Sequence, residues 1–519
     1  MTVSRTPQLR ELRDLLDDSG FAGVGETEWA SAAESALRGA ALSSLDTLLP
    51  GGIATGPLYS PHRHSTADDP VGLPGAAPHV RGAAATSGWG SWEVRQIHDV
   101  TLAGTPDAVA VDTTAGVDAV TVARGWDPQR HADALAAGIG DAAAAGVTVH
   151  LQSGTTAAHV AALTDAFESC GADATRQRSW LGMDPIAGAA SGWSGHASAE
   201  PTAELTVEMC NAARSATDLA QRMPHAVPLE ADGSVFADAG ATDATELAAM
   251  LATGAAWLRV ICDHASGPGR AVDAAARLLG FTVSAGPDPY QTTAKCRALR
   301  WCWSRMLGAC GVGDGALRMR LHAVTSTAML SALDPWINML RATTAAFGAA
   351  NGGVDAITVR PFDHVSAGPT SSSLGWRVAA NTQLILRHES RLGSVIDPAG
   401  GSWYLEELTR TLAHAAWDRF RSIESAGGVC AALAGGALAE AIAEDRAQRD
   451  ERIAAGDYVL VGVTAFTEPR AHSPHDDAQR RASCQAVQAV PADTLSCSLG
   501  THRWAAPHET GDSQTEAAH

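Results

Sequence analysis

The sequence predicts an α/β fold in which a parallel sheet is covered by helices. From Trp92 onward, short apolar runs alternate with longer alanine-rich runs that have helical spacing. Repeated strand–helix units of this length are typical of parallel sheets, because parallel neighbours need a long crossover, usually a helix. Seven clear strands and an eighth expected near 227–229 fit a (β/α)8 barrel of TIM type. A doubly wound sheet shows the same alternation.

The predicted strands are short runs bounded by turn residues. They are Ala108–Val111, Ala119–Val122, Val147–Leu151, Leu258–Cys262, Phe281–Ser284, Leu317–His322 and Ala356–Val359, with the eighth at Val227–Leu229. Between them the spacing of apolar residues predicts helices over Pro128–Ala144, Ala157–Glu168, Ala203–Arg222, Thr242–Thr253, Arg270–Leu279, Thr293–Met306 and Met329–Phe347.

The two ends of the chain have a different composition from the barrel region, 91–430. Residues 1–90 read as an N-terminal helical segment, with an apolar face around Leu9, and an extended linker arm rich in proline and glycine. Residues 431–465 read as a helical extension, clearest at Ala437–Arg449. From 466 to 519 the chain is polar and without periodicity, so we expect a largely disordered tail.

The amino-acid composition excludes several classes of function. Lysine and arginine number 37 against 57 aspartate and glutamate, and the formal net charge of −20 argues against nucleic acid or an anionic membrane as the main partner. Nine scattered cysteines without a CxxC pair indicate reduced intracellular thiols. With no long apolar run and no signal peptide, we expect a cytoplasmic protein. His62 and His64 lack further ligands at suitable spacing, so the pair is read as a solvated loop.

The stretch from Arg360 to Trp417 organises the rest of the chain. A loop containing Gly368-Pro369 precedes a helix that is expected to run to about His388. The turn Asp397–Gly401 combines a proline with two glycines that permit positive φ, and a second helix follows it. The residues alone therefore predict a helix, a glycine turn and another helix.

Two segments in this stretch resemble the signature of the methylmalonyl-CoA mutase family. They are Asn381–Leu386 and Ile396–Glu406, which reads IDPAGGSWYLE. The resemblance implies the acyl-CoA-binding (β/α)8 barrel of that family, and it favours the barrel over a doubly wound sheet.

The same resemblance indicates a degenerate active site. Ile97 follows Arg95-Gln96 where catalytic members have a tyrosine, and Val235 stands where their Tyr-His pair has the histidine. Val324 replaces the glutamine of the pattern R-x-H-x-Q-T-S, and the stretch Leu181–Ile186 also lacks its glutamine. Valine and isoleucine cannot donate a hydrogen bond to a reacting carbonyl or carboxylate. We therefore predict that this chain has no catalytic residues and that Ile97, Val235 and Val324 mark a degenerate cleft.

Cofactor and partner are implied by the resemblance alone. Catalytic members end in a cobalamin-binding domain marked by D-x-H-x-x-G, and this motif does not occur in the sequence. The pattern is similar to the small, non-catalytic subunit of the heterodimeric enzymes, so we expect no cofactor on this chain and adenosylcobalamin on a large catalytic partner. Small subunits usually keep a degenerate C-terminal domain, and its absence here departs from the family pattern.

Two other functions remain open from the sequence. The chain could be the catalytic barrel of a split acyl-CoA mutase with cobalamin on a separate chain, or a stand-alone acyl-CoA-binding or regulatory protein. Arg320 and His322 fit remnants of an acyl-CoA site, which a small subunit could retain, and they fit equally a strand-end arginine paired to a barrel carboxylate. Asp363-His364 is read as a structural hydrogen bond rather than an acid–base pair.

Overall fold

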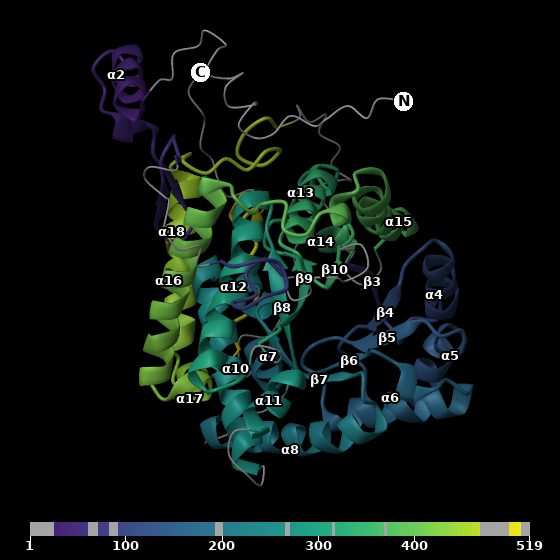
Figure 1. Ribbon diagram of the computed structural model, residues 1–519. Coiled ribbons are helices and arrows are strands. Elements are labelled where there is room, and N and C mark those ends of the chain that lie inside the picture. Colours follow the sequence, from purple (N-terminus) through teal and green to yellow (C-terminus); the bar gives the residue numbers. More distant parts are fainter. Residues whose placement is uncertain are drawn as a thin grey trace, which may run out of the picture. The chain divides into compact units, whose positions relative to one another are not determined.

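A computed structural model describes residues 25–60, 71–82, 92–192, 201–264, 270–313, 317–367, 371–467 and 498–509 (Figure 1). The chain divides into two compact units, residues 1–59 and 60–519. The first unit contains α2 (Glu26–Ala36), the 3-10 turn η1 (Leu42–Leu45) and an antiparallel hairpin of β1 (Thr47–Leu49) and β2 (Ile53–Thr55). The apolar face expected around Leu9 and the His62–His64 pair lie outside the described residues.

The second unit is built on eight parallel strands arranged as a nearly closed barrel, which confirms the predicted fold class. Their order in the sheet is β5-β4-β3-β10-β9-β8-β7-β6. The strands are β3 (Glu93–His98), β4 (Ala119–Val122), β5 (Thr148–Leu151), β6 (Trp180–Met183), β7 (Val227–Asp232), β8 (Leu279–Ala285), β9 (Arg320–Thr325) and β10 (Ala356–Thr358).

The barrel closes at a seam between β5 and β6. A single bridge, Thr155 to Met183, joins the two strand ends, and the backbone N–H groups of Gly154 and Thr155 both donate to the carbonyl of Gly182 at 3.0 Å. Gly182 has φ +63°, and a Cβ there would lie 2.5 Å from the carbonyl oxygen of Gln152. Glycine is required at this position because the two backbones approach too closely for a side chain.

Helices follow most strands and cover the outside of the sheet (Figure 1). They are α4 (Thr105–Thr114), α5 (Ala132–Ala144), α6 (Ala157–Cys170), α8 (Pro201–Arg222), α10 (Asp243–His264), α12 (Pro289–Ala309), α13 (Ile337–Asn351) and α15 (Ser373–Leu384). Short helices at the carboxyl ends of strands are α7 (Pro185–Ala190), α9 (Ser234–Asp238) and α14 (His364–Ala367), and α11 (Arg270–Arg277) precedes β8.

Two predicted strands are wrong and two strands were missed. Ala108–Val111 lies inside α4, where Pro106 in the first turn starts a helix and the apolar residues alternate only by chance. Leu258–Cys262 is the second half of α10. The missed strands are β3, in which polar residues such as Glu93 interrupt the apolar pattern, and β6, which is only four residues long and contains a glycine. Strand β9 also begins and ends three residues later than predicted.

Helix α10 runs eleven residues past its predicted end at Thr253 because Gly254 does not terminate it. A Cβ at Gly254 would lie 2.7 Å from the ring of Trp303, so this glycine allows α10 and α12 to pack closely. Among the described helices, α10 alone is long and apolar enough to cross a membrane, but 78% of that window is buried inside the fold. We interpret it as a core helix.

The C-terminal part of the unit packs against the barrel wall. Helix α16 (Trp403–Ser425) lies along α10 and α12, and α17 (Gly428–Ala434) and α18 (Ala437–Ala454) follow it (Figure 1). Of the tail expected to be largely disordered, residues 498–509 are described and include α20 (Ala506–Glu509). This segment bonds to the barrel through the backbone N–H groups of Leu499, His502 and Trp504.

Candidate functional site

The family-like signature at 396–406 forms a buried ionic cluster rather than a reactive site. Arg297, almost fully buried on α12, pairs with the carboxylate of Asp397 through one terminal nitrogen and with Glu406 at 2.5 Å through the other. Arg81 approaches the same carboxylates at 3.6 and 3.8 Å. Asp397 has φ +50°, which the adjoining turn requires. The signature therefore ties the linker arm, α12 and α16 together.

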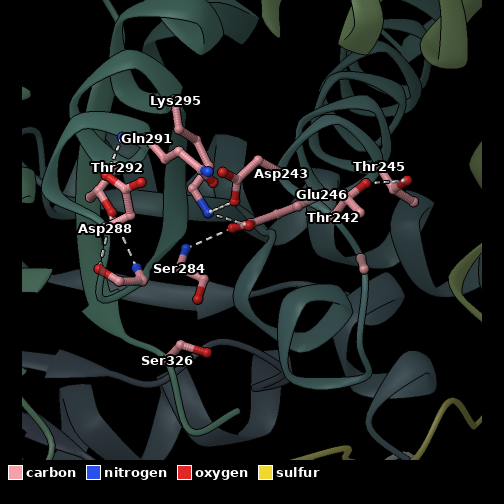
Figure 2. Close-up of polar contacts among 12 residues, drawn as sticks. Thr242, Asp243, Thr245, Glu246, Ser284, Asp288, Gln291, Thr292, Lys295 and Ser326 are labelled. Atoms are coloured by element: carbon pink, nitrogen blue, oxygen red, sulfur yellow. Dashed lines mark hydrogen bonds and ion pairs between the residues drawn. The ribbon is translucent and has the colours of Figure 1, made fainter. Parts of the chain in front are cut away.

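A second buried cluster contains Lys295, the only lysine in the chain. Its Nζ lies 2.7 Å from a carboxylate oxygen of Asp243 and 2.7 Å from one of Glu246 (Figure 2). The other oxygen of Glu246 accepts the backbone N–H of Ser284, so the cluster joins α10, α12 and the end of β8. The two carboxylates raise the pKa of Lys295, and burial raises the pKa of Glu246 to about 7. This arrangement stabilises the barrel wall.

The three positions predicted to be degenerate lie at the carboxyl ends of barrel strands, where TIM barrels place their chemistry. Ile97 on β3 and Val324 on β9 line one small cavity inside the barrel, and Val235 on α9 follows Ser234, which also lines it. The cavity measures about 30 Å³, close to the share of one water molecule. The hydroxyls of Thr121 and Ser153 face it without a protein partner, which suits a single bound water.

A row of polar side chains crosses four neighbouring strands on the inside of the barrel. Thr282 on β8 donates its hydroxyl to Glu230 on β7, and it accepts from Nδ1 of His322 on β9 at 3.0 Å. Nε2 of His322 then accepts from the hydroxyl of Thr358 on β10 at 2.9 Å. This order requires a neutral imidazole with its proton on Nδ1, and burial accordingly holds the pKa of His322 well below its usual value.

The opposite side of the barrel interior contains a second polar group. His150 on β5 accepts the backbone N–H of Trp180 at Nδ1, 2.9 Å away, so its proton lies on Nε2 and points to Glu93 at 2.8 Å. Arg95 pairs with the same carboxylate at 2.6 Å and stacks 4.7 Å from the Trp180 ring. Burial lowers the pKa of His150 to about 4, and Arg95 and His150 together hold the pKa of Glu93 far below its usual value despite burial.

Carboxyl groups near the carboxyl ends of β6 and β7 have raised pKa values. Burial raises the pKa of Asp184 to about 7 and that of Glu230 to about 8, and the neighbouring Asp232 adds to both shifts. Asp184 accepts the backbone N–H groups of Ala187 at 3.0 Å and Asp232 at 2.9 Å, so its carboxyl fixes α7 against β7. A raised pKa often marks catalysis, but here both oxygens of Asp184 bond to the protein's own backbone.

The remaining sequence candidates do not converge on this cavity. Arg320 lies at the start of β9, away from the carboxyl ends of the strands. Burial lowers its pKa, and the negative charge of Asp355 partly offsets this by attracting the guanidinium. Of the two interpretations of Arg320, the structure therefore favours the barrel carboxylate. Asp363 accepts the backbone N–H of Ser372 at 2.8 Å and helps to start α15. Burial and Arg360 lower the pKa of His364 to about 3.

Sequence reasoning missed most of the interior polar residues. Glu93, His150 and Glu230 were not singled out, although each is a titratable residue in a strand that is covered by helices. Such a residue in a strand covered by helices can only point into the barrel. A titratable residue in such a strand could therefore have been recognised from the sequence, but the sequence does not show which side chains it bonds to.

The two histidines inside the barrel do not fit the role of a cobalt ligand. Both ring nitrogens of His150 and of His322 are used in hydrogen bonds within the barrel, so neither is free for cobalt. Among the described residues, no group of three or more His, Cys, Asp and Glu could hold a metal ion. The cavity that Ile97 and Val324 line measures about 30 Å³.

The comparisons with known proteins all point to the same family. The sequence model of the family described as methylmalonyl-CoA mutase matches residues 139–495. The methylmalonyl-CoA mutase small subunit of Streptomyces virginiae is 39% identical over 82% of this chain and 66% of its own length. The small subunit of Propionibacterium freudenreichii subsp. shermanii is 32% identical over 80% of this chain and 62% of its own length.

A relative named methylmalonyl-CoA mutase, from Cereibacter sphaeroides, is 29% identical over 84% of this chain and 64% of its own length. This chain thus spans a little under two thirds of the length of these relatives. The match of the family model covers well over half of the chain, including six of the eight barrel strands. The chain belongs to the methylmalonyl-CoA mutase family.

Proposed function

We propose that this chain is the small, non-catalytic subunit of a heterodimeric methylmalonyl-CoA mutase. It would pair with a large catalytic subunit that carries adenosylcobalamin and interconverts (R)-methylmalonyl-CoA and succinyl-CoA. Two of the similar relatives are themselves named small subunits. The cytoplasm is the compartment in which we expect the complex.

The observation that carries the proposal is the filled barrel interior. Ile97 and Val324 offer no hydrogen bond to a substrate, and the cavity between them is about 30 Å³. The surrounding polar groups bond to one another across the strands instead of pointing into open space. A catalytic site needs donors preorganised around a substrate, so this geometry supports a structural role for the barrel. It also argues against a retained acyl-CoA site at the barrel axis.

The test is a mutase assay of this chain and the large subunit of the same organism, separately and together, with adenosylcobalamin. We expect no turnover by this chain alone, and a stable complex with the large subunit in which the large subunit is more active or more heat-resistant. Turnover of methylmalonyl-CoA by this chain with only a separate cobalamin-binding chain would instead establish the split-mutase alternative. Failure of the two subunits to associate would leave the stand-alone alternative.

A further inference from the structure

Helix α13 has an apolar stripe on the side that faces away from the barrel. Its small residues, including Ala342, Ala345 and Ala349, are buried against the core. On the opposite side Leu340 is 68% exposed, and Trp336 at the helix N-cap is 56% exposed. The outward stripe consists of the apolar residues Trp336, Leu340 and Phe347, with the exposed Thr344 between the last two. A surface helix ordinarily carries polar or charged residues on this side.

Helix α13 also has very few charged side chains. Its 15 residues include one charged side chain, Arg341, and that guanidinium turns away from solvent. It donates to the side chain of Asn338 at 2.8 Å and to the carbonyl of Val461 at 2.7 Å. The stripe therefore contains no charge that would favour contact with water. A helix that is apolar on both sides is typical of a buried helix.

A groove beside the stripe offers room for a side chain of a partner. Helix α13, the segment 457–461 and Trp504 enclose a cavity of about 490 Å³. Its apolar lining residues include Ile337, Leu340, Val459, Leu460 and Val461. Exposed apolar surface bordered by polar residues marks protein interaction sites, and aromatic residues such as Trp336 and Trp504 are enriched in them.

The rim of the groove is acidic. Asp288 and Asp457 line it, and Asp334 lies next to it, near Gly462. The one cation of the groove, Arg341, is already bonded to the protein's own Asn338 and Val461. This distribution suits a partner segment in which an apolar side chain is flanked by arginine or lysine. A second copy of this chain is a poor match, because each copy carries a formal net charge of −20.

We infer that the outward stripe of α13 and the adjoining acidic-rimmed groove form a docking surface for the large mutase subunit, which contributes an apolar segment flanked by basic residues. The inference rests on the proposed function, because it takes the large subunit as the partner. It adds the place of contact and the chemistry of the segment that binds there.

The experiment measures the Kd between the full chain and the large subunit of the same organism by titration calorimetry. Leu340→Arg removes the apolar anchor and places a cation opposite the expected basic residues. We expect it to raise Kd at least tenfold. The matched control is Val111→Arg on α4, which follows β3 rather than β9; Val111 is similarly exposed at 66%, and Kd should stay within twofold. Thermal melting of each variant checks that the fold is unchanged.

A second variant tests the charge argument separately. Asp457→Asn removes one rim carboxylate from an exposed position, so we expect about a threefold rise in Kd at low salt that disappears at high salt. An unchanged Kd at low salt would overturn the basic character assigned to the partner segment.

The outcomes separate the two proposals. If the unmodified chain does not bind the large subunit, both the proposed function and this inference fail. If it binds and Leu340→Arg behaves like Val111→Arg, the docking surface is wrong while the proposed function stands. If the chain alone forms a dimer that Leu340→Arg dissociates, the surface binds a second copy and the assignment to the large subunit is overturned.

Discussion

The barrel interior and the outer side of α13 differ in the side chains they contain and in the space beside those side chains. Inside the barrel, buried groups such as Glu230 and His322 bond to one another around a cavity of about 30 Å³. On α13, Leu340 is exposed beside a groove of about 490 Å³. Polar residues are thus concentrated around the small cavity in the barrel, and apolar residues line the larger groove beside α13. The contrast favours the outer surface over the barrel interior as the place where this chain binds a partner.

The largest expected effect comes from breaking the buried charge cluster of the barrel wall. Lys295→Met leaves Glu246 and Asp243 without their cation in a buried site, so we expect a loss of about 3–5 kcal/mol in the free energy of unfolding. Chemical denaturation measures it. Lys295→Arg keeps the charge and should lose less. Equal losses for both variants would show that the exact shape of lysine matters more than its charge.

The seam of the barrel is the next most sensitive place. Gly182→Ala combines a positive φ with a Cβ placed 2.5 Å from a carbonyl oxygen, so we expect a loss of about 3 kcal/mol. Gly146→Ala is the control, because Gly146 has φ +86° but nothing within 4 Å of the added Cβ. It should lose about 1 kcal/mol. Similar melting temperatures for the two variants would contradict the close approach at the seam.

The interior carboxyl groups predict a pH dependence of stability. Burial raises the pKa of Glu230 to about 8 from about 4.5 in the unfolded chain. Between these pH values the folded protein holds a proton that the unfolded chain releases, so the free energy of unfolding falls as pH rises from about 4.5 to 8. Glu230→Gln imitates the protonated carboxyl and should remove that decline, about 4 kcal/mol between these pH values. Melting temperatures at pH 5, 6.5 and 8 measure the slope, and parallel curves would contradict the prediction.

The sequence predicted the barrel and the family, because strand–helix alternation and family-like motifs are local patterns. It missed β3, where polar residues such as Glu93 break the apolar run, and β6, which is only four residues long and contains Gly182. It also ended this helix at Thr253, whereas in the structure α10 continues through Gly254, which packs against the ring of Trp303 on another helix. The partners of His322 could not be predicted, because β8, β9 and β10 bring Thr282 and Thr358 together only after the barrel forms.

The smallest expected effect on stability comes from a substitution in the outward stripe of α13. Leu340→Gln replaces a side chain that is already 68% exposed, so the free energy of unfolding of the isolated chain should change by less than about 0.5 kcal/mol. Denaturation of the chain alone measures it, beside Leu321→Gln, a change at a fully buried position of β9. The buried substitution should lose several kcal/mol. A large loss from Leu340→Gln would mean that the stripe is covered within the isolated chain, and the exposed side of α13 would then serve the fold rather than a partner.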